Sequence, residues 1–253
     1  MLFAHKVILV EGLAEQLLLS IFANYQGISL EENHIAVINV GGRYFSHFLH
    51  LFDSKKLNTI NKKIVCLTDQ DPERKKRTPK SNFKKCYPFE YNLNVEEYEY
   101  KRNDLPYRPG KHPNIAFFSQ DEIEGKTLEY DLILSNPSLE LLVTDSMKNQ
   151  DEIKAMMQFY KDNKPLADYI KLMRSSEENR RIIESIEQNT SMTNEQKCRS
   201  LIASRYLNSV GKGENALELA YILEENLKNQ GTDEYKEFNV PRYIKNAILW
   251  VCQ

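Results

Sequence analysis

Four carboxylates follow two hydrophobic segments that have the pattern of buried β-strands. Glu11 comes directly after the first segment, and Glu15 comes one turn later on a predicted helix. Asp69 and Asp71 come directly after the second segment. Burying an unpaired charge is costly, so carboxylates at the ends of interior strands normally have a cation as partner. Because hard cations prefer oxygen ligands, these residues predict a Mg²⁺ or Mn²⁺ site.

The elements that must position these residues alternate between strands and helices. An apolar-periodic helix follows Gly12, and another follows the Gly41–Gly42 pair. Such alternation predicts an α/β fold with a parallel sheet, in which sites lie at the carboxyl ends of the strands. The expected strands span residues 6–10, 34–39, 63–68 and 114–118.

Residues 72–113 are rich in charge and tyrosine and lack periodicity, so we predict a long irregular loop. Its first part is strongly basic, with Glu73 as the one acid. A run of charge is usually a solvated surface, but the position next to the acidic residues makes a contact with DNA phosphates an equal alternative. The candidate DNA-binding residues are Lys75, Lys76, Arg77, Lys84 and Lys85.

The second half of the chain has a helical pattern. Asn136–Pro137 is typical of a helix start, and residues 193–196 form a predicted capping box. Two further helices are expected to begin near Lys212 and Pro241. We therefore predict three parts: residues 1–134 as the first part of the α/β domain, 135–205 as an inserted helical subdomain, and 206–253 as closing helices.

The composition narrows the class of protein. The chain is 41% hydrophobic and 28% charged, as expected for a globular domain, and its net charge of -2 does not by itself indicate nucleic-acid binding. No apolar run approaches the ~20 residues of a membrane span, and no signal peptide is visible. The four cysteines lack Cys-x-x-Cys spacing, which favours a reducing, cytoplasmic location. Because a core strand begins almost at once, we expect this chain to be part of a longer protein.

Two motifs together carry a resemblance to a known family. The segment Val10–Glu15, combined with a later strand that ends in Asp69–Asp71, resembles a Toprim domain. Three further segments resemble the carboxy-terminal region of OLD (overcoming lysogenisation defect) nucleases: residues 126–132, 211–216 and 240–244. The resemblance covers nearly the whole chain. It implies a Toprim-type parallel sheet flanked by helices, with an inserted all-helical subdomain.

The resemblance also implies roles for individual residues. Glu11 and Glu15 match the first acidic motif of the family, Asp69 and Asp71 the paired aspartates, Thr127 and Glu129 a Ser/Thr-x-Glu element, and Lys212 a catalytic lysine. Glu11 with Asp69 and Asp71 is a ligand set for one metal ion. The candidate ligands of a second ion are Glu15, Asp71, Thr127 and Glu129. Two such ions are suited to hydrolysing a phosphodiester bond.

The expected function is therefore a divalent-metal-dependent DNA endonuclease, and the resemblance implies a role in phage defence. It also implies an ABC-type ATPase domain. The sequence has no Walker A pattern, so we expect any ATP site in a missing segment or a partner chain. Homo-oligomerisation is left open. The alternatives are a non-catalytic Toprim scaffold that binds DNA in recombination or repair, a topoisomerase, and a primase.

Overall fold

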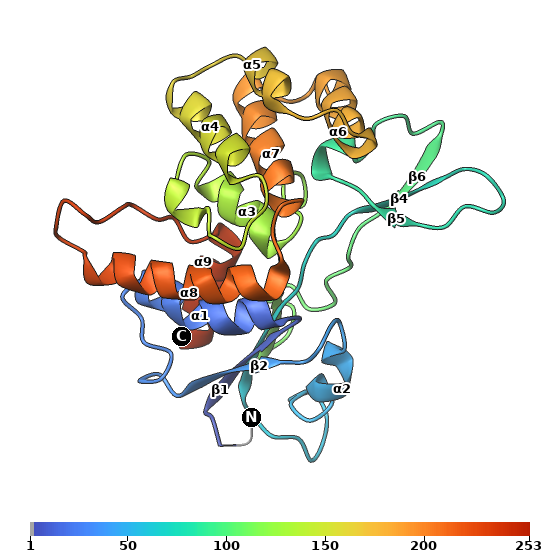
Figure 1. Cartoon of the computed structure of the whole chain (residues 1–253). Helices are drawn as coiled ribbons and strands as arrows, with labels where there is room; N and C mark the ends of the chain where they lie inside the picture. Colours follow the sequence, from blue (N-terminus) through green and yellow to red (C-terminus); the bar gives the residue numbers. More distant parts are fainter. Residues whose placement is uncertain (1–2) are drawn as a thin grey trace.

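The computed structural model describes residues 3–253, apart from the side chain of Lys212. Its centre is a four-stranded sheet in the order β2-β1-β3-β7, and each neighbouring pair is parallel (Figure 1). The expected α/β class, with a parallel sheet flanked by helices, is confirmed. The strands are Lys6–Val10 (β1), Ile35–Asn39 (β2), Lys63–Leu67 (β3) and Ile115–Phe118 (β7).

Helices cover both faces of this sheet. Helices α1 (Leu13–Asn24) and α9 (Arg242–Cys252) pack on one face, and the short α2 (Phe45–Leu49) packs on the other. Helix α8 (Lys212–Lys228) lies along the outer side of α1 (Figure 1). Successive side chains of β1 point to opposite faces and enter different core clusters, so the strand is hydrophobic at consecutive positions.

A group of helices lies beyond one edge of this layered core (Figure 1). Helix α7 is central to the group and contacts the other four helices in it. The hydrophobic core continues from the sheet into these helices, so the predicted boundary between residues 134 and 135 stays a prediction. The group comprises α3 (Leu128–Ser135), α4 (Gln150–Lys161), α5 (Leu166–Leu172), α6 (Glu177–Gln188) and α7 (Asn194–Leu207).

The capping box at Thr193–Gln196 is confirmed, but the helix start predicted at Asn136–Pro137 is wrong. Helix α3 ends just before Asn136, and the next α-helix begins only at Gln150. The Asn136 amide is instead used between segments. It donates to Leu132 O at 2.9 Å and Asn239 O at 2.8 Å, and it accepts from Asn239 N at 2.7 Å.

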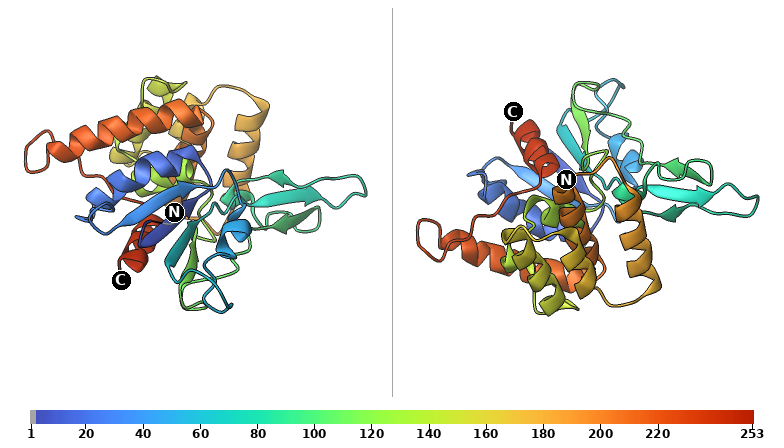
Figure 2. Two further views of the ribbon diagram at one scale, coloured as in Figure 1. Left: turned by 90° about the horizontal axis from the view of Figure 1, so that it is seen from below. Right: turned by 90° about the horizontal axis from the view of Figure 1, so that it is seen from above.

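Residues 72–113 are more ordered than a loop. They contain a three-stranded antiparallel sheet, β5-β4-β6, which extends sideways from the body of the protein (Figure 2). Its strands are Glu73–Lys76 (β4), Lys84–Lys85 (β5) and Tyr98–Lys101 (β6). Hydrophobic alternation does not mark β4 or β5, which consist of charged residues, and only β6 alternates, with Tyr98 and Tyr100. Cross-strand charge pairs such as Lys75 opposite Glu99 join β4 to β6.

In the part of the chain that the structure describes, no helix has the length and apolar character needed to cross a bilayer.

Candidate active site

Five carboxylates line one pocket of about 250 Å³ at the carboxyl edge of the sheet. Two strand ends and two helix starts supply them. Glu11 follows β1, and Asp69 and Asp71 follow β3. Glu15 and Glu129 lie in the first turns of α1 and α3, where the helix dipole favours a negative charge. The parallel order of β1 and β3 is what brings these distant parts of the sequence together.

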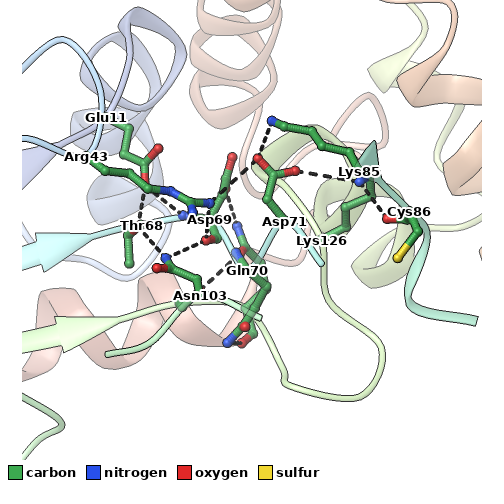
Figure 3. Close-up of polar contacts among 12 residues, drawn as sticks. Glu11, Arg43, Thr68, Asp69, Gln70, Asp71, Lys85, Cys86, Asn103 and Lys126 are labelled. Atoms are coloured by element: carbon green, nitrogen blue, oxygen red, sulfur yellow. Dashed lines mark hydrogen bonds and ion pairs between the residues drawn. The ribbon is translucent and has the colours of Figure 1, made fainter. Parts of the chain in front are cut away.

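Glu11 is held in place by the end of the neighbouring strand. Its Oε1 atom accepts a hydrogen bond from the Thr68 hydroxyl and another, at 3.1 Å, from Asp69 N (Figure 3). The same oxygen lies 3.4 Å from Arg43 Nε. The backbone O of Glu11 accepts from Gly42 N at 2.8 Å. Gly42 lines the pocket at a φ of 126°, which a side chain would strain.

Asp69 lies where the negative charge of the pocket converges. Burial raises its pKa well above the ordinary value of 3.8, and the charges of Glu15, Glu129 and Asp71 raise it further. One hydrogen bond opposes this effect, from Gln120 Nε2 at 2.6 Å to Asp69 Oδ1. A raised pKa means that the ionised carboxylate lacks compensation, which a bound cation would supply.

Asp71 has three basic neighbours in the structure. Lys85 Nζ is 2.5 Å from its Oδ2 atom, Arg43 Nη2 is 3.8 Å from Oδ2, and Lys126 Nζ is 3.6 Å from Oδ1 (Figure 3). The φ of Asp71 is 36°, so the backbone turns sharply here, where the chain leaves the sheet. Lys126 is buried, which lowers its pKa, and its Nζ also donates to Cys86 O at 2.9 Å.

The donor atoms fit a hard divalent cation, but their arrangement does not yet surround one. All the acidic donors are oxygens, and two further signs point to a missing partner. The buried atoms Asp71 Oδ1 and Thr127 Oγ1 have no hydrogen-bond partner among the described residues. Within residues 3–253, no three His, Cys, Asp or Glu side chains converge as metal ligands. Metal binding would therefore require Glu11 and Asp71 to exchange their basic partners for the ion.

The structure brings most of the predicted ligands together. The pocket contains Glu11, Glu15, Asp69, Asp71 and Glu129. Thr127 is the N-cap residue of α3, two positions before Glu129. The side chain of Lys212 lies outside the described part of the structure; its neighbour Gly213 lines the pocket. Proximity alone does not test metal binding, so the ligand assignments stay predictions.

The predicted DNA-binding residues separate into two groups. Lys85 lies at the acidic pocket beside Asp71, whereas Lys84 is exposed on the same strand. The others lie farther along the small antiparallel sheet. The sequence suggested one acid near them, but β6 and the turn before it add two acidic partners. Lys75 pairs with Glu99 at 3.0 Å, and Lys76 pairs with Glu97 at 3.4 Å. Arg77 Nε donates to the backbone oxygen of Val95 at 3.0 Å.

Sequence reasoning missed the basic and amide residues around the carboxylates. Arg43 follows the strand β2, so its position at the same sheet edge was a usable signal. Lys126 directly precedes the Thr127–Glu129 element, which was a second signal. Gln120 lies two residues after β7 and carried the same signal as Arg43. Asn103 carries no such signal, because it reaches Asp69 from an irregular segment.

Comparison with known proteins identifies the first part of the chain. Residues 2–71 match the family described as the Toprim domain of overcoming lysogenization defect (OLD) protein-like proteins. Residues 2–71 are therefore similar to an OLD-like Toprim domain. The predicted resemblance to an OLD-like Toprim domain is confirmed over these residues. The matched OLD-like segment contains Glu11, Glu15, Asp69 and Asp71.

Two solved structures are similar over nearly the whole chain. The C-terminal region of the Burkholderia pseudomallei OLD protein is 22% identical, with a TM-score of 0.44, over 98% of this chain and 97% of that one. The C-terminal region of the Xanthomonas campestris pv. campestris OLD protein is 19% identical, with a TM-score of 0.43, over 99% of this chain and 93% of that one. No curated protein matches the chain.

Proposed function

We propose that this chain is a divalent-metal-dependent DNA endonuclease that nicks or cleaves phosphodiester bonds. The observation that carries the proposal is the convergence of five carboxylates in one pocket of an OLD-like Toprim domain. A pocket with this much negative charge would repel a DNA phosphate unless cations were bound between them. Divalent cations are therefore part of the proposal, with Mg²⁺ or Mn²⁺ best suited to an all-oxygen donor set.

The proposed ligand sets follow the two sides of the pocket. Glu11, Asp69 and Asp71 would hold one ion from the strand ends. Glu15, Asp71, Thr127 and Glu129 would hold the other from the strand end and the two helix starts. Two bound ions supply an activated water and stabilise the charge that develops on the leaving 3′ oxygen.

Other residues of the chain would act on the substrate itself. Arg43 and Lys85 contact the carboxylates through exposed side chains, so both have room to turn towards a phosphate when a metal replaces them. Asn103 positions the end of β3, because its Nδ2 atom donates to Thr68 Oγ1 at 2.9 Å and to Asp69 O at 2.8 Å. Thr68 in turn donates to Glu11.

Cleavage of supercoiled plasmid tests the proposal. We expect nicked or linear products with Mg²⁺ or Mn²⁺ and none with EDTA. Glu11→Gln and Asp69→Asn should abolish cleavage and weaken Mn²⁺ binding measured by calorimetry. Glu122→Gln is the matched control, because Glu122 is an exposed acid that pairs with Arg108 outside the pocket. Wild-type cleavage by both pocket variants would refute the assignment.

Lys212 is included in the proposal on the strength of the family resemblance. It begins α8, and a lysine there is suited to neutralising charge that builds on the phosphate. Lys212→Ala should lower turnover ~10²-fold or more, the usual effect of removing a preorganised charge stabiliser. Metal affinity should change little, because a lysine ammonium has no lone pair to donate. Lys212→Arg should restore turnover only in part, because a guanidinium does not reproduce the compact ammonium. Wild-type turnover by Lys212→Ala would exclude a catalytic role for Lys212.

A non-catalytic Toprim scaffold for DNA is the second candidate. The basic partners of Asp71 favour it, because protein cations there already offset part of the acidic charge. DNA binding with no cleavage in either metal, unchanged by Glu11→Gln, would support this candidate instead.

The wider assignment rests on the same proposal. We place the chain in the cytoplasm as the catalytic part of an OLD-type phage-defence nuclease. Its ATP hydrolysis would come from an ABC-type ATPase domain in another segment or in a partner chain. Copurification with such an ATPase, together with plaque counts on cells that carry or lack the Asp69→Asn variant, would test it.

A further inference from the structure

A second pocket, of about 310 Å³, lies next to the acidic one between α2 and the segment that leads to β7. Its floor is apolar and comes from the buried side chains Phe45, Leu49, Ile115 and Phe117. The rings of Phe45 and Phe117 meet edge to face, with centroids 5.5 Å apart. Tyr107 forms part of the wall and lies 6.3 Å from Phe117 between ring centroids.

Two residues connect this pocket to the proposed catalytic centre. Arg43 and Thr68 both line it, and both contact Glu11. A ligand in this pocket would therefore lie one side chain away from the first carboxylate of the acidic pocket. Figure 3 shows Arg43, Thr68 and Asn103 together beside Glu11 and Asp69.

The rim of the pocket combines positive charge with hydrogen-bonding groups. Arg43 and Lys56 are about half exposed there, so they can face the phosphates on either side of a bound nucleotide. Asn103 has committed both hydrogens of its amide nitrogen to Thr68 and Asp69, which leaves the amide oxygen to accept from a ligand. The exposed side chains of Ser46 and Asp104 supply further hydroxyl and carboxylate groups.

We propose that this pocket takes one unpaired nucleobase of the DNA next to the phosphate that is cleaved. The inference rests on the proposed DNA substrate and names its class as DNA with an unpaired nucleotide. A base removed from its stack requires aromatic and apolar walls, polar groups at its edge and cations at the mouth of the pocket. The volume is at the small end of ligand sites, which suits one base and excludes a folded protein segment.

The acids in this pocket fit the same occupant. Asp53 already has partners: His112 Nε2 lies 3.0 Å from its Oδ1 atom, and Lys56 Nζ lies 3.5 Å from Oδ2. Hydrogen bonding to His112 and Lys55 N helps to lower the pKa of Asp53 despite its burial, so it stays ionised and paired. Asp104 is exposed at the rim, where a carboxylate can accept from the amino group of a base.

Binding of three DNA duplexes tests the proposal. The first is fully paired, the second carries one bulged adenine, and the third has an abasic site at the bulge. Fluorescence anisotropy in Ca²⁺ measures affinity, because Ca²⁺ also takes oxygen ligands and offsets the acidic charge, and gel electrophoresis of the same samples confirms that the DNA is uncleaved. Wild-type protein should bind the bulged adenine about tenfold more tightly than either other duplex, as expected when one base gains an aromatic stack. Equal affinity for all three would overturn the proposal.

A matched pair of variants locates the effect. Ser46 is exposed and lines the pocket, so Ser46→Trp should fill it and remove the preference for the bulged adenine. His47 is the next residue on α2 and is exposed outside the pocket, so His47→Trp should keep the preference. An unchanged preference in the Ser46→Trp protein would overturn the assignment to this pocket.

A further readout is independent of these variants and of cleavage. A 2-aminopurine at the bulge should gain fluorescence on binding wild-type protein, because it leaves the neighbouring DNA bases whose stacking quenches it; unchanged emission would count against the pocket. Plasmid cleavage without any base preference would refute the pocket alone. A base preference without cleavage in either metal would refute the endonuclease alone.

Discussion

Replacing Glu90 should destabilise the protein more than replacing any exposed acid of the small antiparallel sheet. Glu90 is fully buried and its carboxylate has two cationic partners, Arg74 Nη2 at 2.9 Å and Arg181 Nη1 at 3.3 Å. It also accepts from Tyr87 N at 2.6 Å. Arg74 lies on β4 and Arg181 on α6, so this carboxylate joins the base of the sheet to the helical group.

The size of the expected destabilisation follows from the burial of the Glu90 carboxylate. Glu90→Ala would leave the Arg74 guanidinium without a counter-charge and Arg181 with Glu178 alone, 2.8 Å from its Nη2 atom. Breaking a buried pair in this way costs about 3–5 kcal/mol. For a chain of this size, each kcal/mol lowers the melting temperature by ~2–4 °C, so we expect a decrease of about 6–20 °C. Differential scanning calorimetry at neutral pH measures it directly.

The matched control is Glu99→Ala. Glu99 pairs with Lys75 at 3.0 Å, but both side chains are substantially exposed, so the pair contributes less than ~1 kcal/mol. Its melting temperature should stay within about 3 °C of wild type. The melting temperature of Glu90→Gln should lie between those of Glu90→Ala and Glu99→Ala, because the amide keeps hydrogen-bonding capacity but loses the charge. If the Glu90→Ala and Glu99→Ala proteins melt together, the reasoning from burial is refuted.

Three further predictions concern charge. Lys85→Met should tighten Mn²⁺ binding about 2–5-fold in calorimetry, since an exposed pair contributes up to ~1 kcal/mol, whereas Lys84→Met should not; equal affinities would show that Lys85 does not compete with metal. Because the pKa of Asp69 is raised in the folded protein, Asp69 favours folding fully only at low pH, and this contribution is lost as the pH rises through that pKa. Asp69→Asn should therefore raise the melting temperature at neutral pH in EDTA, and a decrease would contradict this. Joint alanine substitution of three basic residues should lower the salt dependence of DNA binding by up to ~3 units of slope, and an unchanged slope would exclude phosphate contacts. The three are Lys75, Lys76 and Arg77.

The sheet and the acidic pocket were predictable because their signals are local. Buried parallel strands are hydrophobic throughout, and a carboxylate directly after such a strand must lie at the carboxyl edge. Glu11 and Asp69 were placed in this way from the sequence alone. The neighbouring acids followed from helical and strand periodicity, one turn or two residues further on.

The cations around the pocket were harder to predict because their partners are distant in sequence. Lys85 belongs to a strand of only two residues, both lysines, which hydrophobic periodicity cannot detect. The second pocket was invisible for a related reason. The sequence marks Phe45 and Phe117 as ordinary core residues, and only the folded structure shows that a pocket lies against them.

Arg43 has contacts of two kinds, and the difference decides what it can do when a metal binds. Its Nη2 atom donates to the backbone oxygen of Asp69 at 3.0 Å, whereas its distances to the Glu11 and Asp71 carboxylates are longer, at 3.4 and 3.8 Å. A metal that took both carboxylates would leave the bond to the backbone in place. The guanidinium has five donors in a fixed plane, so the released ones would still be held at the boundary of the two pockets. A phosphate with a base in the apolar pocket would meet them there, and the same residue would then link base recognition to the position of the scissile bond.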